Sequence, residues 1–190
     1  LADMSEKILA KDDKDARCHY LLARYDFEQP RPDKRSTPAP EEKRSRDRVL
    51  NARTHLAKVE ATKDYPLWRT LHLKAKIDAW LARRYAEGKN VELAAQEEKT
   101  LRTLLAEAAE HAKAGDGLKN MSGWDIDGLL DLTVMGVSVT LDDLKKEGEV
   151  DAKRLLAAVD QALTTCESLV EKKGLPLDRV AQTAIRTMML

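Results

Sequence analysis

Aromatic residues make up only 4% of this 190-residue chain, and glycine (8) and proline (6) are also scarce. The apolar share of 43% therefore depends largely on alanine and leucine, which favour helices over strands. Few glycines and prolines leave few places where the chain can turn. The composition predicts an all-α fold, and a chain of this length buries enough surface to need neither disulfides nor metals for stability.

The chain also lacks an excess of either charge, since Lys+Arg and Asp+Glu both number 33. Interleaved charges of both signs are typical of solvated helix faces. A nucleic-acid-binding protein more often carries a basic excess on one face, so we expect no nucleic-acid partner. Cysteine is limited to Cys18 and Cys166, which is too few for a disulfide framework. Both lie among apolar helical residues, and we expect small buried side chains.

No apolar run approaches the roughly 18 residues of a membrane-spanning helix. The most apolar stretch, residues 129–141, is interrupted by polar residues, so we expect no membrane insertion. The chain begins at Leu1 rather than methionine, and we therefore expect a piece of a longer or processed protein. The compartment stays open because a signal peptide could lie outside this piece, although the cytoplasm is favoured. The oligomeric state is open as well.

Apolar residues recur at three- and four-residue steps over most of the chain, as amphipathic helices require. The spacing predicts a helix end within residues 5–11, a helix starting at Pro176, and helices over about 15–28, 41–61, 66–87, 90–114 and 149–173. Asp15 is a predicted N-cap, and Gly88 is a predicted C′ residue. Residues 29–44 hold four of the six prolines and predict an exposed linker.

Residues 124–147 give a mixed signal. Trp124 to Met135 fit a helix, whereas Val137, Val139 and Leu141 alternate with polar residues as in a strand. Because no partner strand is predicted, we expect a helix over about 125–136. The pair Thr140 and Asp143 then resembles a capping box that opens a short helix to Lys146.

The predicted helix 66–87 carries two apolar stripes. One contains Trp68, Leu71, Ala75, Ala79 and Ala82, and the other contains Leu73, Ile77, Trp80 and Leu81. A helix that is apolar on two sides is usually sandwiched between neighbours. Both a stack of helix pairs and the centre of a two-layer bundle have this property.

No phosphate loop, dinucleotide fingerprint or nucleophile elbow is present. The four histidines have no zinc-binding spacing. Asp125 to Gly128 hint at a calcium loop, but the remaining ligands are missing and a carboxylate-rich helix start is expected. His72 and Asp78 share one helix and are expected to be satisfied polar residues at a helix interface. We therefore predict no enzyme activity, catalytic residue, cofactor or metal site.

Residues 8–29 resemble a tetratricopeptide repeat, with the end of one repeat's second helix followed by the next repeat's first helix. The matching residues are Ile8, Leu9, Asp12, Asp13 at the usual proline, Ala16, His19 at the usual tryptophan, Leu22, Ala23 at the small position, Tyr25 and Phe27. The chain departs from that family at Pro30, where glycine is usual, and at Asp26, a common aromatic position. Trp68 and Leu71 resemble the start of another first helix, with His72 at the small position. The two first helices lie about 50 residues apart instead of the family's 34.

The resemblance implies antiparallel helix pairs stacked as a right-handed solenoid, with an irregular α-helical bundle as the alternative. We expect hairpins in 1–114 and further hairpins in 115–190, packed as one continuous domain. The implied function is a non-catalytic scaffold for a protein or peptide partner. The expected partner-binding residues lie on the two first-helix candidates: Tyr20, Arg24, Trp68, Arg69, His72 and Lys76. The alternatives are an accessory domain of an enzyme encoded elsewhere and a small all-α ligand binder or enzyme.

Overall fold

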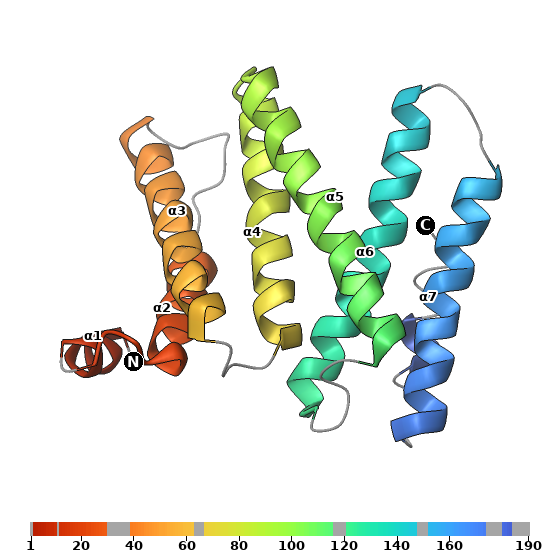
Figure 1. Ribbon diagram of the computed structural model, residues 1–190. Helices are drawn as coiled ribbons and strands as arrows, with labels where there is room; N and C mark the ends of the chain where they lie inside the picture. Colours follow the sequence, from red (N-terminus) through yellow and green to blue (C-terminus); the bar gives the residue numbers. More distant parts are fainter. Residues whose placement is uncertain are drawn as a thin grey trace. The chain divides into compact units, whose positions relative to one another are not determined.

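The computed structural model describes residues 2–10, 12–29, 39–62, 67–115, 121–147, 152–173 and 180–183. Across these ranges the chain is helical apart from short turns, and no strand occurs, so the all-α prediction is confirmed there. The helices are α1 (Ala2–Leu9), α2 (Ala16–Glu28), α3 (Ala39–Thr62), α4 (Leu67–Glu87), α5 (Val91–Ala114), α6 (Gly123–Glu147) and α7 (Ala152–Lys173) (Figure 1). Within the described ranges, no helix combines the length and apolarity needed to cross a bilayer.

The chain divides into two compact units, Leu1–Lys99 and Thr100–Leu190. The division falls inside α5. The first turns of α5 therefore belong to the first unit and the rest to the second.

Helix boundaries follow the predicted ones closely for α2, α4 and α5. The predicted linker 29–44 was too long, because α3 already begins at Ala39 and includes Pro40 in its first turn. Proline is tolerated there since the first turn leaves its backbone donors unpaired in any case. The remainder of that linker and the predicted break at 63–66 lie outside the described residues. So does most of the helix predicted from Pro176, of which residues 180–183 are helical.

The two helices predicted within residues 124–147 are one continuous helix, α6. Thr140 is not an N-cap: its hydroxyl donates to the carbonyl oxygen of Gly136 at 3.0 Å. A threonine inside a helix commonly bonds back to the carbonyl four residues earlier. The five-residue alternation that resembled a strand is thus part of a helix.

Side chains cap the starts of α2 and α6. Asp15 accepts a hydrogen bond from the backbone N–H of Cys18 at 2.9 Å, which confirms it as the N-cap of α2. At α6, Asp125 Oδ2 accepts from both the backbone N–H and the hydroxyl of Ser122, at 2.8 and 2.6 Å. The backbone N–H of Asp125 in turn donates to Ser122 Oγ at 3.4 Å. This reciprocal arrangement is a capping box, so the acidic residues before Gly128 do mark a helix start.

The C-terminus of α4 differs from the prediction by one residue. Lys89, not Gly88, adopts the left-handed conformation, with φ of 60°. The N–H of Asn90 bonds to Tyr85 O at 2.9 Å, and the N–H of Lys89 bonds to Ala86 O at 3.0 Å. These are the two bonds of a Schellman motif in which Lys89 is C′. Asn90 then caps α5 by accepting from the N–H of Leu93 at 3.3 Å, which joins α4 to α5 without a loop.

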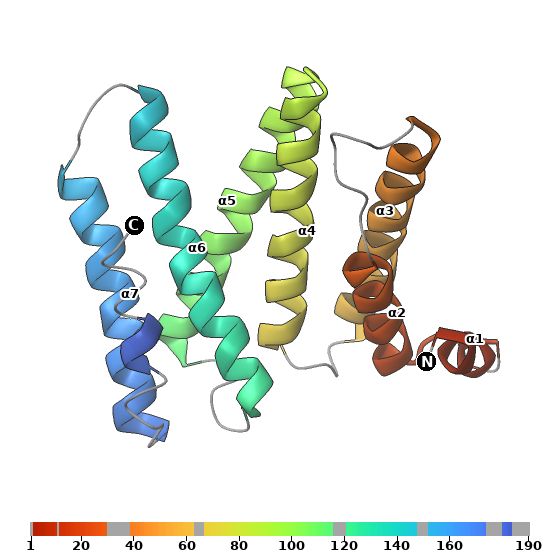
Figure 2. The same ribbon diagram turned by 180° about the vertical axis from the view of Figure 1, so that it is seen from behind.

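The core of the first unit lies where α2, α3 and α4 meet (Figures 1 and 2). Both predicted stripes of α4 contribute buried residues, which confirms that this helix is covered on two sides. The main cluster contains Ala23 and Phe27 of α2, Val49, Ala52 and Leu56 of α3, and Leu73, Ile77 and Leu81 of α4.

In the second unit, α6 and α7 lie side by side in both views. Buried side chains come from α5 (Leu101, Leu104, Ala108), α6 (Leu129, Leu132, Val137, Leu144) and α7 (Ala162, Cys166, Leu169). Cys18 and Cys166 are both free thiols with buried side chains, as predicted. Burial raises the pKa of each thiol, so both act as small apolar residues.

Candidate functional site

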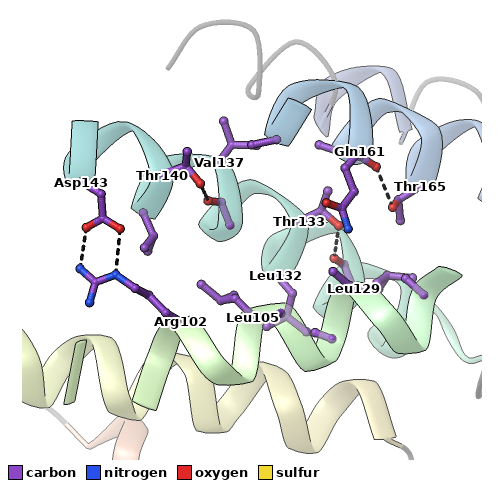
Figure 3. A pocket seen from close by; sticks show the side chains of 18 residues that line it. Arg102, Leu105, Leu129, Leu132, Thr133, Val137, Thr140, Asp143, Gln161 and Thr165 are labelled. Carbon is purple, nitrogen blue, oxygen red and sulfur yellow. Dashed lines mark hydrogen bonds and ion pairs between the residues drawn. The ribbon is translucent and has the colours of Figure 1, made fainter. Parts of the chain in front are cut away.

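A pocket of about 270 Å³ lies between α5, α6 and α7 in the second unit (Figure 3). Its apolar surface comes from side chains no larger than leucine: Leu105, Ala108, Ala109 and Ala112 of α5, Leu129, Leu132, Gly136 and Val137 of α6, and Ala158 and Ala162 of α7. Gly136 lines this space, and a Cβ atom placed on it would meet no atom within 4 Å outside the adjacent residues and the backbone of the same helical turn. Small residues on three adjacent helices thus leave the space open.

An ion pair between two helices lies at one end of the pocket. Arg102 of α5 donates to Asp143 of α6 through Nε at 2.8 Å and through a terminal nitrogen at 2.5 Å (Figure 3). This two-pronged geometry is the strong form of an arginine–carboxylate pair. The hydrogen bonds from Arg102 hold the pKa of Asp143 below its usual value. The pair therefore stays ionised at neutral pH and contributes no net charge.

The threonine hydroxyl groups in the pocket donate hydrogen bonds to backbone carbonyls of their own helices. Thr133 donates to Leu129 O at 2.8 Å, and Thr165 donates to Gln161 O at 3.0 Å. Their remaining lone pairs can accept hydrogen bonds from a ligand. The titratable side chains among the lining residues are Arg102 and Asp143, which bind each other. The lining thus suits binding of an apolar group and offers no separate base or nucleophile.

The first unit contains a buried ion cluster that sequence reasoning missed. Arg53 of α3 donates to Asp78 of α4 at 2.6 Å and to both carboxylate oxygens of Glu97 of α5, with one distance of 3.0 Å. Asp78 is 1% exposed, and its Oδ2 has no hydrogen-bond partner within the described residues. Burial raises the pKa of Asp78 although Arg53 opposes this effect. Burial alone would lower the pKa of Arg53, but the two carboxylates outweigh it and raise that pKa.

A histidine pair joins α2 to α3. The Nδ1 atoms of His19 and His55 lie 2.9 Å apart, and His19 Nε2 lies 2.7 Å from the carbonyl oxygen of Asp13. Because a carbonyl only accepts, His19 must donate through Nε2, and in the neutral pair His55 donates through Nδ1. Burial, followed by the nearby His19, lowers the pKa of His55. The pair has a structural explanation as a bridge between two helices.

The predicted partner-binding residues do not line the pocket, and they have different environments. Trp68 is only 1% exposed and belongs to the core, so its assignment to a partner surface was wrong. Tyr20 packs against the core of the first unit, and Arg24 pairs with Glu28 at 2.8 Å. Arg69 and His72 are half-buried, whereas Lys76 is exposed. Asp78, considered with His72 in the sequence, pairs instead with Arg53.

The sequence did contain a signal for the pocket. Gly136 stands inside an apolar helical stretch, and alanines dominate one face of residues 105–112. An isolated glycine within a helix often has a packing or functional reason. This signal was not enough to predict a pocket, because the remaining lining residues come from α7, which lies further along the chain.

Comparison of the chain with protein-family models, with curated protein sequences and with solved structures finds no match. The candidate site therefore stands on its own geometry.

Proposed function

We propose that this chain is a non-catalytic helical module that binds a protein or peptide, and that the pocket between α5, α6 and α7 takes up apolar side chains of the partner. The observation that carries the proposal is the open space at Gly136, bounded by apolar residues of three helices. Burial of apolar area there supplies the affinity, at roughly 25 cal/mol per Å² removed from water. The threonine oxygens and the Arg102–Asp143 pair orient the bound segment.

Pocket size favours side chains over a whole metabolite. Sites for small molecules usually measure about 300–1,000 Å³. The pocket, at about 270 Å³, lies just below that range and is partly open to solvent. One or two side chains of a bound segment fit this space better. A small apolar molecule is the second candidate, because three helices surround the pocket, and it is distinguished by the experiment below.

We also propose that the helices of the first unit form tetratricopeptide-like pairs, with an irregular bundle as the alternative. The support is the resemblance over residues 8–29. Ala23, at the family's small position, is fully buried where α2 meets its neighbours. On this proposal a second contact surface includes Tyr20, Arg24, Arg69, His72 and Lys76. We expect Lys76→Glu to lower the affinity for the partner without unfolding the unit, because this side chain is exposed.

The pocket proposal is tested by filling the pocket. Gly136→Leu places a side chain in the open space, and Ala157→Leu adds the same kind of side chain at an exposed site of α7 outside the pocket. Peptides are selected from a random displayed library on the unmodified chain, and their Kd is measured for all three proteins. We expect Gly136→Leu to weaken binding by about tenfold or more and Ala157→Leu to leave it unchanged. Equal binding to Gly136→Leu, with its helicity and thermal stability retained, would overturn the proposal. Binding of small apolar molecules, but of no peptide, would favour the second candidate.

A further inference from the structure

The pocket continues into a second hollow along α5 and α7. That hollow is lined by Ala109, Glu110, Ala112 and Lys113 of α5 and by Gln161, Thr164, Thr165, Glu167 and Glu171 of α7. Four of these residues, Ala109, Ala112, Gln161 and Thr165, also line the pocket. The two spaces therefore adjoin, and we call them together the α5–α7 groove.

Charge is distributed unequally along the groove. At the end with the pocket, Arg102 and Asp143 neutralise each other. At the other end, the described lining residues include three carboxylates, those of Glu110, Glu167 and Glu171, and one ammonium group, that of Lys113. The groove is thus apolar and neutral at one end, and the described side chains at the other end carry a net negative charge.

Helix direction adds to this negative charge. Residues 102–112 of α5 and 158–165 of α7 line the pocket, and both helices then continue to the acidic end. Since α5 ends at Ala114 and α7 at Lys173, both helices have their C-termini there. The C-terminal end of a helix carries partial negative charge and favours cations. Two helix dipoles and three carboxylates therefore act in the same direction.

We propose that the occupant of the α5–α7 groove is a basic amphipathic segment of a partner protein, with apolar side chains in the pocket and Lys or Arg over Glu110, Glu167 and Glu171. This inference rests on the proposed function and specifies the chemistry of the partner. Among the described lining residues, unneutralised carboxylates lie at the acidic end, so the cationic side chains of the segment face that end and the segment binds in one direction. Complementary charge of this kind increases the association rate and selects against acidic segments.

The test uses the random peptide library and a charge-reversed protein. Glu110→Lys/Glu167→Lys/Glu171→Lys reverses the acidic end. A control with the same change in net charge, Glu107→Lys/Asp142→Lys/Asp160→Lys, alters exposed carboxylates that do not line the groove. Peptides selected on the unmodified chain should contain apolar residues and more Lys+Arg than Asp+Glu. Their Kd should rise by about tenfold with the groove reversal, should change little with the control, and should rise with salt.

The outcomes separate the two proposals. If Gly136→Leu abolishes binding but the selected peptides show no basic excess, or the groove reversal has no more effect than its control, the chemistry assigned to the partner is wrong and the pocket stands. Peptides that bind Gly136→Leu as well as the unmodified chain would overturn both proposals. If the selected peptides contain more Lys+Arg than Asp+Glu, and bind more weakly both to Gly136→Leu and to the groove reversal, the result supports both proposals.

Discussion

Arg53 offers the most demanding test of the first unit. Its guanidinium holds two carboxylates, those of Asp78 and Glu97, whose side chains are 1% and 10% exposed. Arg53→Met keeps a side chain of similar length but removes the charge, which leaves both carboxylates without this partner. Removing one member of a buried ion pair costs about 3–5 kcal/mol. Because the Arg53 side chain is 35% exposed, water can reach the vacated space, so we expect the lower value, about 3 kcal/mol.

A surface pair provides the matched control. Arg24 and Glu28 lie one turn apart on α2, with side chains 37% and 53% exposed. Arg24→Met makes the same chemical change and should cost no more than about 0.5 kcal/mol. The difference between the two variants measures the effect of burial.

Urea unfolding followed by tryptophan fluorescence measures both changes, since Trp68 is buried within the first unit and reports on it. In Arg53→Met the carboxylate of Asp78, whose pKa is already raised by burial, loses the opposing effect of Arg53, so its pKa rises further. Stability of that variant should therefore increase as the pH falls from 7 toward about 5. Replacing all three residues, by Arg53→Met/Asp78→Leu/Glu97→Met, should restore most of the lost stability. A loss equal to that of Arg24→Met, with no dependence on pH, would refute the reasoning.

Four further changes test local features. Lys89→Gly should stabilise the chain by about 1 kcal/mol in urea unfolding, because glycine adopts a φ of 60° without the strain that a lysine carries; a loss would contradict the Schellman geometry. Asp143→Asn should cost about 1 kcal/mol at pH 7, and since Arg102 lowers the pKa of Asp143, the difference from the unmodified chain should vanish as the pH falls below about 4. Because the pKa of His55 is lowered in the folded chain, the unfolded chain binds more protons at this residue, and stability should fall as the pH drops below about 6.5. A pH series of thermal unfolding should show this fall in the unmodified chain, and His55→Gln should remove it. Gly136→Ala should raise stability by about 1 kcal/mol in the same urea assay, and a decrease would show that the space at this position is not open.

Local signals in the sequence predicted local structure well. Periodic apolar residues and the cap at Asp15 act within a few residues, so the start of α2 could be located from the sequence. The division of α6 was wrong because alternation over five residues also fits a helix whose sides are covered by neighbours. Trp68 was misassigned for a related reason: helical spacing identifies a stripe, but does not decide whether that stripe faces a core or a partner.

Features that combine distant residues could not be predicted. Arg53 meets Asp78 and Glu97 across separations of 25 and 44 residues, and nothing in the chain next to any of them marks the contact. The pocket is a gap between helices and depends on how closely α5 and α7 approach α6. A one-dimensional pattern gives the size of each lining residue but not that separation.

Gly136 connects the stability of the second unit with its proposed function. A glycine inside a helix costs about 1 kcal/mol relative to alanine, and close packing often explains why it is kept. Packing does not explain it here, since outside the adjacent residues and the backbone of the same helical turn no atom lies within 4 Å of the added Cβ position. The residue therefore lowers stability without allowing a closer approach of α5 or α7. An occupant that needs this space gives the glycine a physical reason, because any larger side chain at this position reduces the pocket. Greater stability and weaker peptide binding should consequently appear together as the side chain at this position grows from glycine to alanine to leucine.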